Sequence, residues 1–413
     1  MKLTAEERAM LKGAGGGPLQ RALAFQLEVG RFYGAKRFVP VTNAHMMGDI
    51  EVMGDSGLEH LRSLARDKAR CALPTTTNAR CFDFAQVERL AQDSGEADKE
   101  RELIGCLRRM DVMTTDTCIN YQTLYQPHYG EHLAWGDTGT VIWANSVCGA
   151  RSNFESGPAA MAAGMTGRVP EYGYHLDRHR RGTLVVDVAT QLKDLAEWGA
   201  LGRLVGEPHQ SYYEVPVFTG VRQTPTADEL KHLGAALASY GSMAMYHMVG
   251  VTPEAPTLAA ALAGRRPHTR MRVTRTTIDR VFAGYKNPDG TCNFVVFSGP
   301  QQSLMEIKTL ADLFDRRRVH PGTTVFVTTA HGVLSAARAL GYAQKLEAAG
   351  VTLLEGVCVY ILQGLTPMRE RNGWNNMISN SAKIVNTITA HKFNTILRRT
   401  ADCVDIACTG VFR

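Results

Sequence analysis

Residues 293–330 read NFVVFSGPQQSLMEIKTLADLFDRRRVHPGTTVFVTTA, and this stretch decides the fold. The apolar runs at 293–299 and 323–330 predict two buried strands, and the amphipathic segment at 303–318 predicts a helix between them. A strand, a helix and a second strand at this spacing form a unit of parallel sheet with the helix packed against it.

The same alternation continues along the chain in both directions. It predicts further strands at 37–42, 71–78, 183–188 and 351–362, and further helices at 56–69 and 333–350. The chain has 413 residues, more than one hydrophobic core usually serves, so two or three subdomains are expected. The predicted class is therefore α/β with mainly parallel sheets, whose ligand sites lie in loops after the carboxyl ends of strands.

Composition narrows the class of protein further. Hydrophobic residues make up 44% of the chain, charged residues 21%, and the net charge is +6 with the basic residues scattered. This is typical of a soluble globular protein, and it does not indicate a nucleic-acid or membrane partner. The nine cysteines are an odd number without a CxxC motif, which predicts reduced thiols in the cytoplasm.

Polar side chains gather where the predicted strands end. A single Thr/Asn-rich turn or a lone histidine at such a place is usually structural, because it satisfies nearby backbone groups. Their joint occurrence at several strand ends favours a binding site. The residues are Asn43, His45, Gly48, Asp49, Thr75, Thr76, Thr77, Asn78, His247, Thr252, Glu254 and Lys383.

Residues 117–153 hold an unusual number of polar and thiol groups beside aromatic residues. They include Cys118, Cys148, a Gly-Glu-His triplet and the turn Trp-Gly-Asp-Thr that ends at Thr138. A packing role does not require such residues, so this segment is expected to serve a metal or a substrate.

Several long motifs resemble the catalytic subunit of the aconitase X family of hydro-lyases. They are PTTTNA (74–79), GEHLAWGDTGTVIWANSVCGARSN (130–153), MYHMVGVTPEAPT (245–257) and SNSAK (379–383). The resemblance runs in order through residues 1–413. It implies an aconitase-like architecture of three α/β/α subdomains, an iron–sulfur cluster, and a swivel domain that is absent from this chain and supplied by a separate small subunit.

The resemblance also implies the metal ligands. Cys118 and Cys358 stand at two of the family's cluster-cysteine positions, and Cys358 is expected within the strand at 351–362. The third family cysteine belongs to a Gly-Cys-Pro-His motif, where this chain has Gly299 and Gln301 instead. Cys292 lies at the far end of the same strand. The other candidates for a replacement ligand are Cys148, Cys403 and Cys408, for which a buried structural thiol is the alternative role.

The implied substrate residues occupy several of the same strand-end loops. Asp137, Thr138 and His45 are the catalytic candidates. The substrate-binding candidates are Gly48, Asp49, Ile50, Asn78, Ala79, Lys383 and Arg151, with Glu131 and His132 expected to line the same pocket. For Arg151 an ordinary salt bridge is an equal alternative.

The predicted function is the dehydration of a small hydroxy acid, with cis-3-hydroxy-L-proline preferred. The alternative substrate is (R)-5-phosphomevalonate, which should need a denser set of Lys and Arg residues than these loops contain. Another alternative is a repurposed relative without a cluster, indicated by the missing third cysteine. A mononuclear metal hydrolase using His45, His132, His247 and Asp137 is the remaining alternative, although no ligand spacing supports it.

Overall fold

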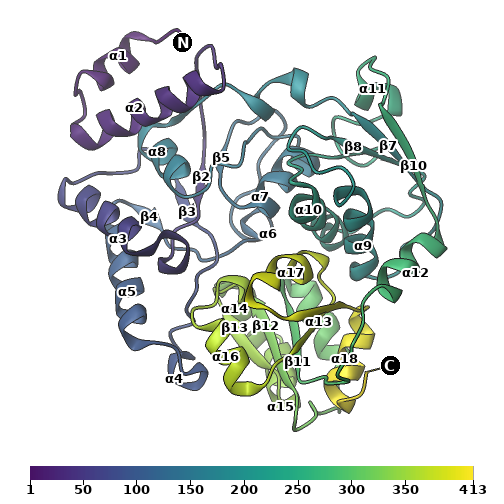
Figure 1. The fold of residues 1–413 in the computed structure, drawn as a ribbon. Coiled ribbons are helices and arrows are strands. Elements are labelled where there is room, and N and C mark those ends of the chain that lie inside the picture. The colour runs from purple at the N-terminus through teal and green to yellow at the C-terminus, as the bar shows by residue number, and fades with distance from the viewer. Residues whose placement is uncertain (413) are drawn as a thin grey trace.

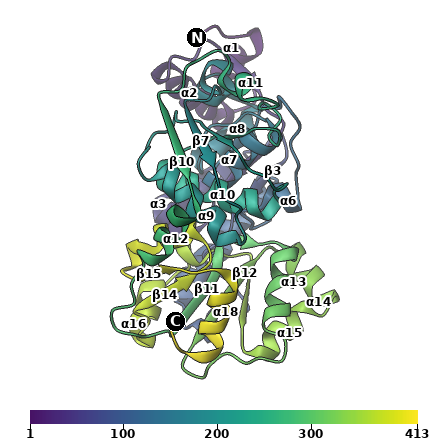
Figure 2. The ribbon, with the colours of Figure 1, turned by 90° about the vertical axis from the view of Figure 1, so that its right-hand side faces the viewer.

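The computed structural model describes residues 1–412 and contains three α/β domains, each built on a parallel sheet (Figures 1 and 2). In Figure 1 the first domain is purple to blue, the second is teal to green, and the third is light green to yellow beneath them. Within residues 1–412, all pairs in the three large sheets are parallel, and only the small β1–β6 pair is antiparallel. The α/β class and the three parallel-sheet subdomains are therefore confirmed.

The first domain is centred on a sheet in the order β4-β3-β2-β5. The strand predicted at 37–42 lies outside it, because β1 pairs with β6. One of its two inner strands is β2, which contains His45, so the expected loop after the first strand is itself partly a strand. The elements are α1 (Ala5–Leu11), α2 (Gly17–Phe32), β1 (Phe38–Pro40), β2 (Ala44–Met46), α3 (Ile50–Arg66), β3 (Thr75–Thr77), α4 (Val87–Leu90), α5 (Ser94–Arg109), β4 (Val112–Met113), α6 (Asn120–Thr123), β5 (Ala134–Trp135), α7 (Thr138–Trp143), the π-helix η1 (Ala144–Cys148), α8 (Pro158–Thr166) and β6 (Arg168–Pro170).

The second domain has the strand order β10-β7-β8-β9, and the strand predicted at 183–188 is its central strand β7. Short 3₁₀ turns, η2 (Gly173–His175) and η3 (Asp177–His179), precede it. The elements are β7 (Leu184–Val188), α9 (Leu195–Gly206), β8 (Pro216–Thr219), α10 (Ala227–Gly241), β9 (His247–Met248), α11 (Leu258–Leu262), β10 (Thr269–Val273) and α12 (Arg275–Ala283).

The third domain has the order β13-β12-β11-β14-β15. The helix predicted at 333–350 is two helices, because Gly341 turns the chain with φ +79°. The strand predicted at 351–362 ends at Glu355, where Gly356 (φ +69°) turns the chain, so Cys358 lies on the loop that follows. The elements are β11 (Phe294–Gln302), α13 (Leu304–Leu313), β12 (Thr324–Thr329), α14 (His331–Ala339), α15 (Tyr342–Ala349), β13 (Thr352–Glu355), the 3₁₀ turn η4 (Val359–Ile361), α16 (Leu365–Asn372), β14 (Asn376–Ser379), α17 (Ala382–Thr387), the 3₁₀ turn η5 (Ile388–His391), β15 (Asn394–Leu397) and α18 (Thr400–Thr409).

The domains pack against one another through shared apolar and ionic contacts. One hydrophobic core includes Trp135 of the first domain, Phe218 of the second and Phe297 of the third. A buried ion pair between Lys231 on α10 and Glu306 on α13 joins the second and third domains. These contacts hold the carboxyl-end loops of different sheets close together. None of the helices formed by residues 1–412 has the length and apolar character needed to cross a bilayer.

Candidate active site

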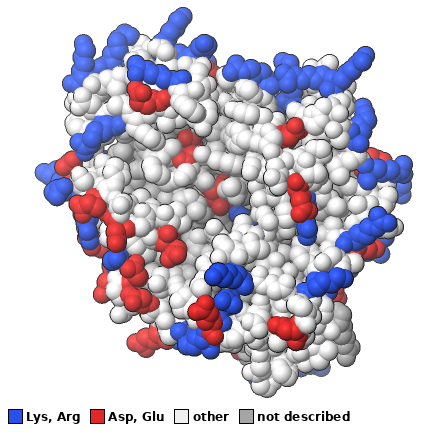
Figure 3. All heavy atoms as spheres, viewed as in Figure 1, with Lys and Arg blue, Asp and Glu red and all other residues white. Residues whose placement is uncertain are grey.

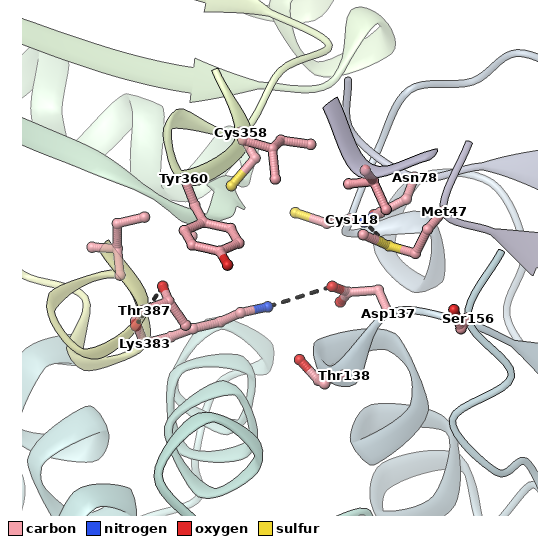
Figure 4. A pocket seen from close by; sticks show the side chains of 15 residues that line it. Met47, Asn78, Cys118, Asp137, Thr138, Ser156, Cys358, Tyr360, Lys383 and Thr387 are labelled. Atoms are coloured by element: carbon pink, nitrogen blue, oxygen red, sulfur yellow. Dashed lines mark hydrogen bonds and ion pairs between the residues drawn. The ribbon is translucent and has the colours of Figure 1, made fainter. Parts of the chain in front are cut away.

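A pocket of about 320 Å³ lies where the first and third domains meet. The face drawn in Figure 3 is hollowed near its centre, and most of the atoms there are uncharged, whereas Lys and Arg gather along the upper edge. Figure 4 shows the side chains that enter the pocket from both domains. The lining residues are Met47, Val52, Asn78, Cys118, Gly136, Asp137, Thr138, Ser156, Gly299, Cys358, Tyr360, Ile361, Lys383, Ile384 and Thr387.

Two thiols meet in the wall of the pocket. Cys118 comes from the first domain just before α6, and Cys358 comes from the loop after β13 in the third domain. Figure 4 shows the sulfur atoms of both residues directed into the pocket. Burial raises the pKa of the Cys118 thiol to about 12 and raises the pKa of Cys358 as well. In the metal-free protein both groups are therefore protonated at neutral pH.

An ion pair spans the pocket between the two domains. Lys383 Nζ on α17 lies 3.5 Å from Asp137 Oδ1, as drawn in Figure 4. The other carboxylate oxygen of Asp137 accepts the main-chain N–H groups of Gly139 (2.8 Å) and Thr140 (3.2 Å), which fixes Asp137 at the start of α7. Burial alone would lower the pKa of Lys383, but the neighbouring Asp137 carboxylate outweighs burial and the pKa of Lys383 is raised. Lys383 is therefore a fixed positive charge in the pocket.

Asn78 presents an unused acceptor to the pocket. It follows β3, and its side chain is buried. Its Nδ2 group contacts Met47 Sδ at 2.8 Å, while Oδ1 has no hydrogen-bond partner among residues 1–412. A buried acceptor without a partner is costly, and the groups placed to donate to this oxygen are the imidazole of His45 behind the wall and a ligand in the pocket.

His45 does not line the pocket. It is fully buried on β2, and its Nδ1 atom lies 2.8 Å from Thr76 Oγ1. Burial lowers the pKa of His45 to about 4, so the imidazole is neutral. His45 is therefore not part of the pocket lining, but it lies directly behind it, beside Asn78 and within range of the Asp137 carboxylate, and its catalytic role stays a prediction.

The other first-loop candidates also lie behind the wall. Asp49 caps α3 by accepting the N–H of Val52 at 3.2 Å, and burial raises its pKa to about 7. The carbonyl of Gly48 accepts a hydrogen bond from Arg80, and Ile50 and Ala79 are buried in hydrophobic cores. Met47 and Val52, on either side of this segment, face the pocket instead.

Arg151 lies in a different cavity, beside Arg180 and Glu254. It pairs with Asp177 at 2.5 Å and donates to the carbonyl of His175. The structure therefore shows the salt bridge rather than a place in the substrate pocket. Glu131 and His132 are also elsewhere. The Glu131 carboxylate binds Thr42, Tyr125 and the N–H of His128, and His132 contacts His175.

The described residues of the pocket do not provide three cysteine ligands for an iron–sulfur cluster. Gly299 lines the pocket with φ +61°, and a Cβ atom there would lie 3.0 Å from Ile384 Cβ and Cδ1. Of the described cysteines, Cys118 and Cys358 alone line the pocket, so Cys148, Cys292, Cys403 and Cys408 do not complete it. A three-cysteine iron–sulfur cluster therefore does not fit these residues.

The histidine hydrolase is not supported either. His45 is behind the wall, His132 contacts His175, and His247 lines the cavity of Arg151. Within residues 1–412 no three His, Cys, Asp or Glu side chains are grouped to hold a metal ion.

The sequence alone did not predict the apolar residues of the lining, and it did not predict Thr387 or Tyr360. Thr387 lies four residues after Lys383 and shares a face of α17 with it, so helical spacing alone could have predicted that the two side chains are neighbours. Tyr360 follows Cys358 by two residues, but nothing in the local pattern shows that its ring turns into the pocket (Figure 4).

Comparisons with known proteins cover all three domains. Sequence models of the first, second and third domains of aconitase X match residues 1–178, 182–283 and 292–409. The chain is 34% identical to the phosphomevalonate dehydratase large subunit of Methanothermobacter thermautotrophicus, over 86% of this chain and 87% of that protein. It is 31% identical to the cis-3-hydroxy-L-proline dehydratase of Pseudomonas aeruginosa, over 92% of this chain and 65% of that protein.

A solved structure resembles the whole fold. The crystal structure of Thermococcus kodakaraensis aconitase X in its holo-form is 29% identical, with a TM-score of 0.87 over 98% of this chain and 100% of that one. Three parallel-sheet domains, with a thiol-bearing pocket between the first and the third, give the chain an aconitase-like architecture. Because the chain matches all three domain models and the dehydratase sequences, it belongs to the aconitase X family.

Proposed function

We propose that this chain is the large, catalytic subunit of a hydro-lyase that dehydrates a small hydroxy acid. The observation that carries the proposal is the single pocket that brings Cys118, Asn78 and Asp137 together with Cys358 and Lys383. The relatives named as dehydratases support the same reaction class.

The polar residues of the pocket suit a hydroxy acid. Lys383 supplies a point charge for a carboxylate, and the free Oδ1 of Asn78 accepts a hydrogen bond from a hydroxyl or an amine. Asp137 Oδ1, 3.5 Å from Lys383 Nζ, and the Thr138 hydroxyl lie beside this charge and would orient the leaving hydroxyl. Several fixed partners along the pocket wall would hold a small substrate in one orientation, which lowers the entropic part of the barrier.

Dehydratases of the aconitase type generally use an iron–sulfur cluster, whose bound iron acts as a Lewis acid on the leaving oxygen. Here the candidates to hold iron are Cys118 and Cys358. The mismatch at Gly299 means that a cluster of the three-cysteine kind is not part of the proposal.

The charge of the pocket favours a substrate with one anionic group, such as cis-3-hydroxy-L-proline. Of the described residues, Lys383 alone brings a positive charge to the lining, and Asp137 offsets it. A phosphate carries up to two negative charges and is usually held by several cationic or N–H groups. The second candidate is (R)-5-phosphomevalonate, favoured by relatives named large subunits whose length this chain matches over 87–94%.

The described residues that line the pocket do not include a free base to accept the proton that the substrate loses. The pocket thiols are protonated, and Asp137 is held by Lys383 and by the start of α7. We propose that a small swivel-domain subunit closes over the pocket and supplies this base, as the names of the large-subunit relatives suggest. All nine cysteines are unpaired, which supports a reducing, cytoplasmic location for the complex.

The test is to assay the purified chain alone and with its candidate small subunit, on cis-3-hydroxy-L-proline and on (R)-5-phosphomevalonate. The proposal expects turnover of cis-3-hydroxy-L-proline only when both polypeptides are present. If the pair turns over (R)-5-phosphomevalonate but not cis-3-hydroxy-L-proline, the second candidate is established. Full activity without the small subunit would remove the need for a partner, and inactivity of the iron-reconstituted pair on both substrates would indicate a repurposed relative.

A further inference from the structure

The two thiols of the pocket are supported by a hydrogen-bonding frame centred on Gln301. This residue is fully buried in β11, and its main-chain N–H donates to Cys118 Sγ at 3.2 Å. The side-chain Oε1 accepts the N–H of Cys118 at 3.3 Å. Two bonds from one residue therefore fix the position of the Cys118 loop, and one of them is directed at sulfur.

The same side chain also holds the loop of the second thiol. Gln301 Nε2 donates to the carbonyl of Asp116 and to the carbonyl of Val357, each at 3.2 Å. Asp116 lies two residues before Cys118, and Val357 directly precedes Cys358. One amide group thus sets the relative position of the two cysteine loops, although they come from different domains.

The frame is itself anchored to the remaining domain. The carbonyl of Gln301 accepts a hydrogen bond from Lys231 Nζ on α10 at 3.2 Å, and Lys231 is fixed by its ion pair with Glu306. Preorganised donors around sulfur are expected where a thiolate has to be held in place, since outer contacts of this kind orient metal ligands.

The wall beside the thiols is closed to a third sulfur. Gly299 has no side chain, its φ of +61° disfavours one, and a Cβ there would lie only 3.0 Å from Ile384. Both features, the φ angle of Gly299 and its closeness to Ile384, are properties of this structure itself. The site is therefore shaped for two thiolates rather than three.

We propose that Cys118 and Cys358 form a two-thiolate site for a single thiophilic divalent metal ion such as iron(II), with its other coordination positions open to water or substrate. Soft thiolate ligands select such ions over magnesium or calcium. Two open positions would allow a hydroxy acid to reach the metal directly. The role of the ion in dehydration rests on the proposed function, but its binding does not.

Cobalt(II) is the probe, because its sulfur-to-metal charge-transfer absorption increases with the number of bound thiolates. The metal-free chain is titrated anaerobically, and the expected result is one cobalt ion per chain with a two-thiolate spectrum. Cys118→Ser and Cys358→Ser should each lower the charge-transfer intensity per bound ion to about half. Cys408→Ser, outside the pocket, is the matched control and should leave the spectrum unchanged.

A designed third ligand tests the closed wall. The double variant Gly299→Cys with Ile384→Ala should raise the intensity about 1.5-fold, and Ile384→Ala alone should not. A three- or four-thiolate spectrum in the unmodified chain would overturn the proposal, as would no cobalt binding or binding that survives loss of both cysteines. If the double variant does not fold, the number of thiolates shown by the wild-type spectrum still tests the proposal. Because no substrate is present, a failed dehydratase assay leaves this result intact.

Discussion

The main-chain N–H of Gln301 lies 3.2 Å from the sulfur of Cys118, although 183 positions separate the two residues along the chain. The contact crosses from the third domain to the first, and the Gln301 side chain continues it to the loop of Cys358. The geometry of the pocket therefore depends on how the domains dock as well as on the loops that carry the thiols.

Gln301→Glu tests this dependence. The change replaces a donor to two carbonyls with a carboxylate oxygen that repels both, so the free energy of unfolding should fall by roughly 3 kcal/mol. Cobalt(II) affinity should fall as well, because the cysteine loops lose their common anchor. Urea unfolding and cobalt titration measure the two effects. Gln344→Glu, on the surface of α15, is the control, and equal behaviour of the two variants would rule out a positioning role for Gln301.

Lys383→Ala tests substrate anchoring. In the assembled enzyme, KM for a carboxylate substrate should rise at least about tenfold, since a buried anion loses its charge partner. Steady-state kinetics provide the measurement. Lys345→Ala removes a surface lysine that also has an acidic partner, Asp315 at 3.3 Å, and should leave KM unchanged. An unaltered KM in Lys383→Ala would show that the substrate carboxylate binds elsewhere.

Gly299→Ala tests the closed wall through stability. An added Cβ would adopt a disfavoured backbone conformation and contact Ile384 at 3.0 Å, so unfolding free energy should drop by about 1–3 kcal/mol. Gly264→Ala is the matched control, because φ there is +77° but no atom lies within 4 Å of the added carbon. Thermal or urea unfolding compares them. If both variants lose the same amount, Ile384 does not crowd the position.

Glu306→Gln tests the interdomain ion pair and has a defined pH dependence. Burial alone would raise the pKa of Glu306, but Lys231 and His232 lower it to about 2 from an ordinary 4.5. A carboxyl whose pKa falls on folding stabilises the protein above its unfolded pKa, and the contribution disappears as pH drops toward the folded pKa. At pH 7 the variant should lose roughly 3–5 kcal/mol, because Lys231 stays buried without its partner.

This loss should shrink as the pH falls from about 4.5 toward 2, where the wild-type carboxyl also becomes protonated. Urea unfolding at a series of pH values gives the curve. Asp312→Asn, which breaks the exposed pair with Lys308 (2.6 Å), serves as the surface comparison. A difference from wild type that stays constant down to pH 2 would contradict the assigned role of Glu306.

Much of the architecture was predictable from local patterns. Apolar runs at 183–188, 293–299 and 323–330 became β7, β11 and β12, because a strand buried on both faces needs little besides such a run. The predictions failed where one glycine redirected the chain. Gly341 divides the helix expected at 333–350, and Gly356 ends the strand expected to continue to 362. Periodicity does not report the sign of φ at a glycine, which is why both breaks were missed.

The sequence by itself determined the parallel α/β class and, through the resemblance, six of the side chains that meet in the pocket: Asn78, Cys118, Asp137, Thr138, Cys358 and Lys383. Only the tertiary structure decided that Arg151 pairs with Asp177, that His45 lies behind the wall, and that Gln301 joins both thiol loops. The physical reason is range. Strand and helix formation follow from neighbouring residues, whereas the partner of a buried charge or amide is set by which loops the docked domains bring within about 3 Å of it.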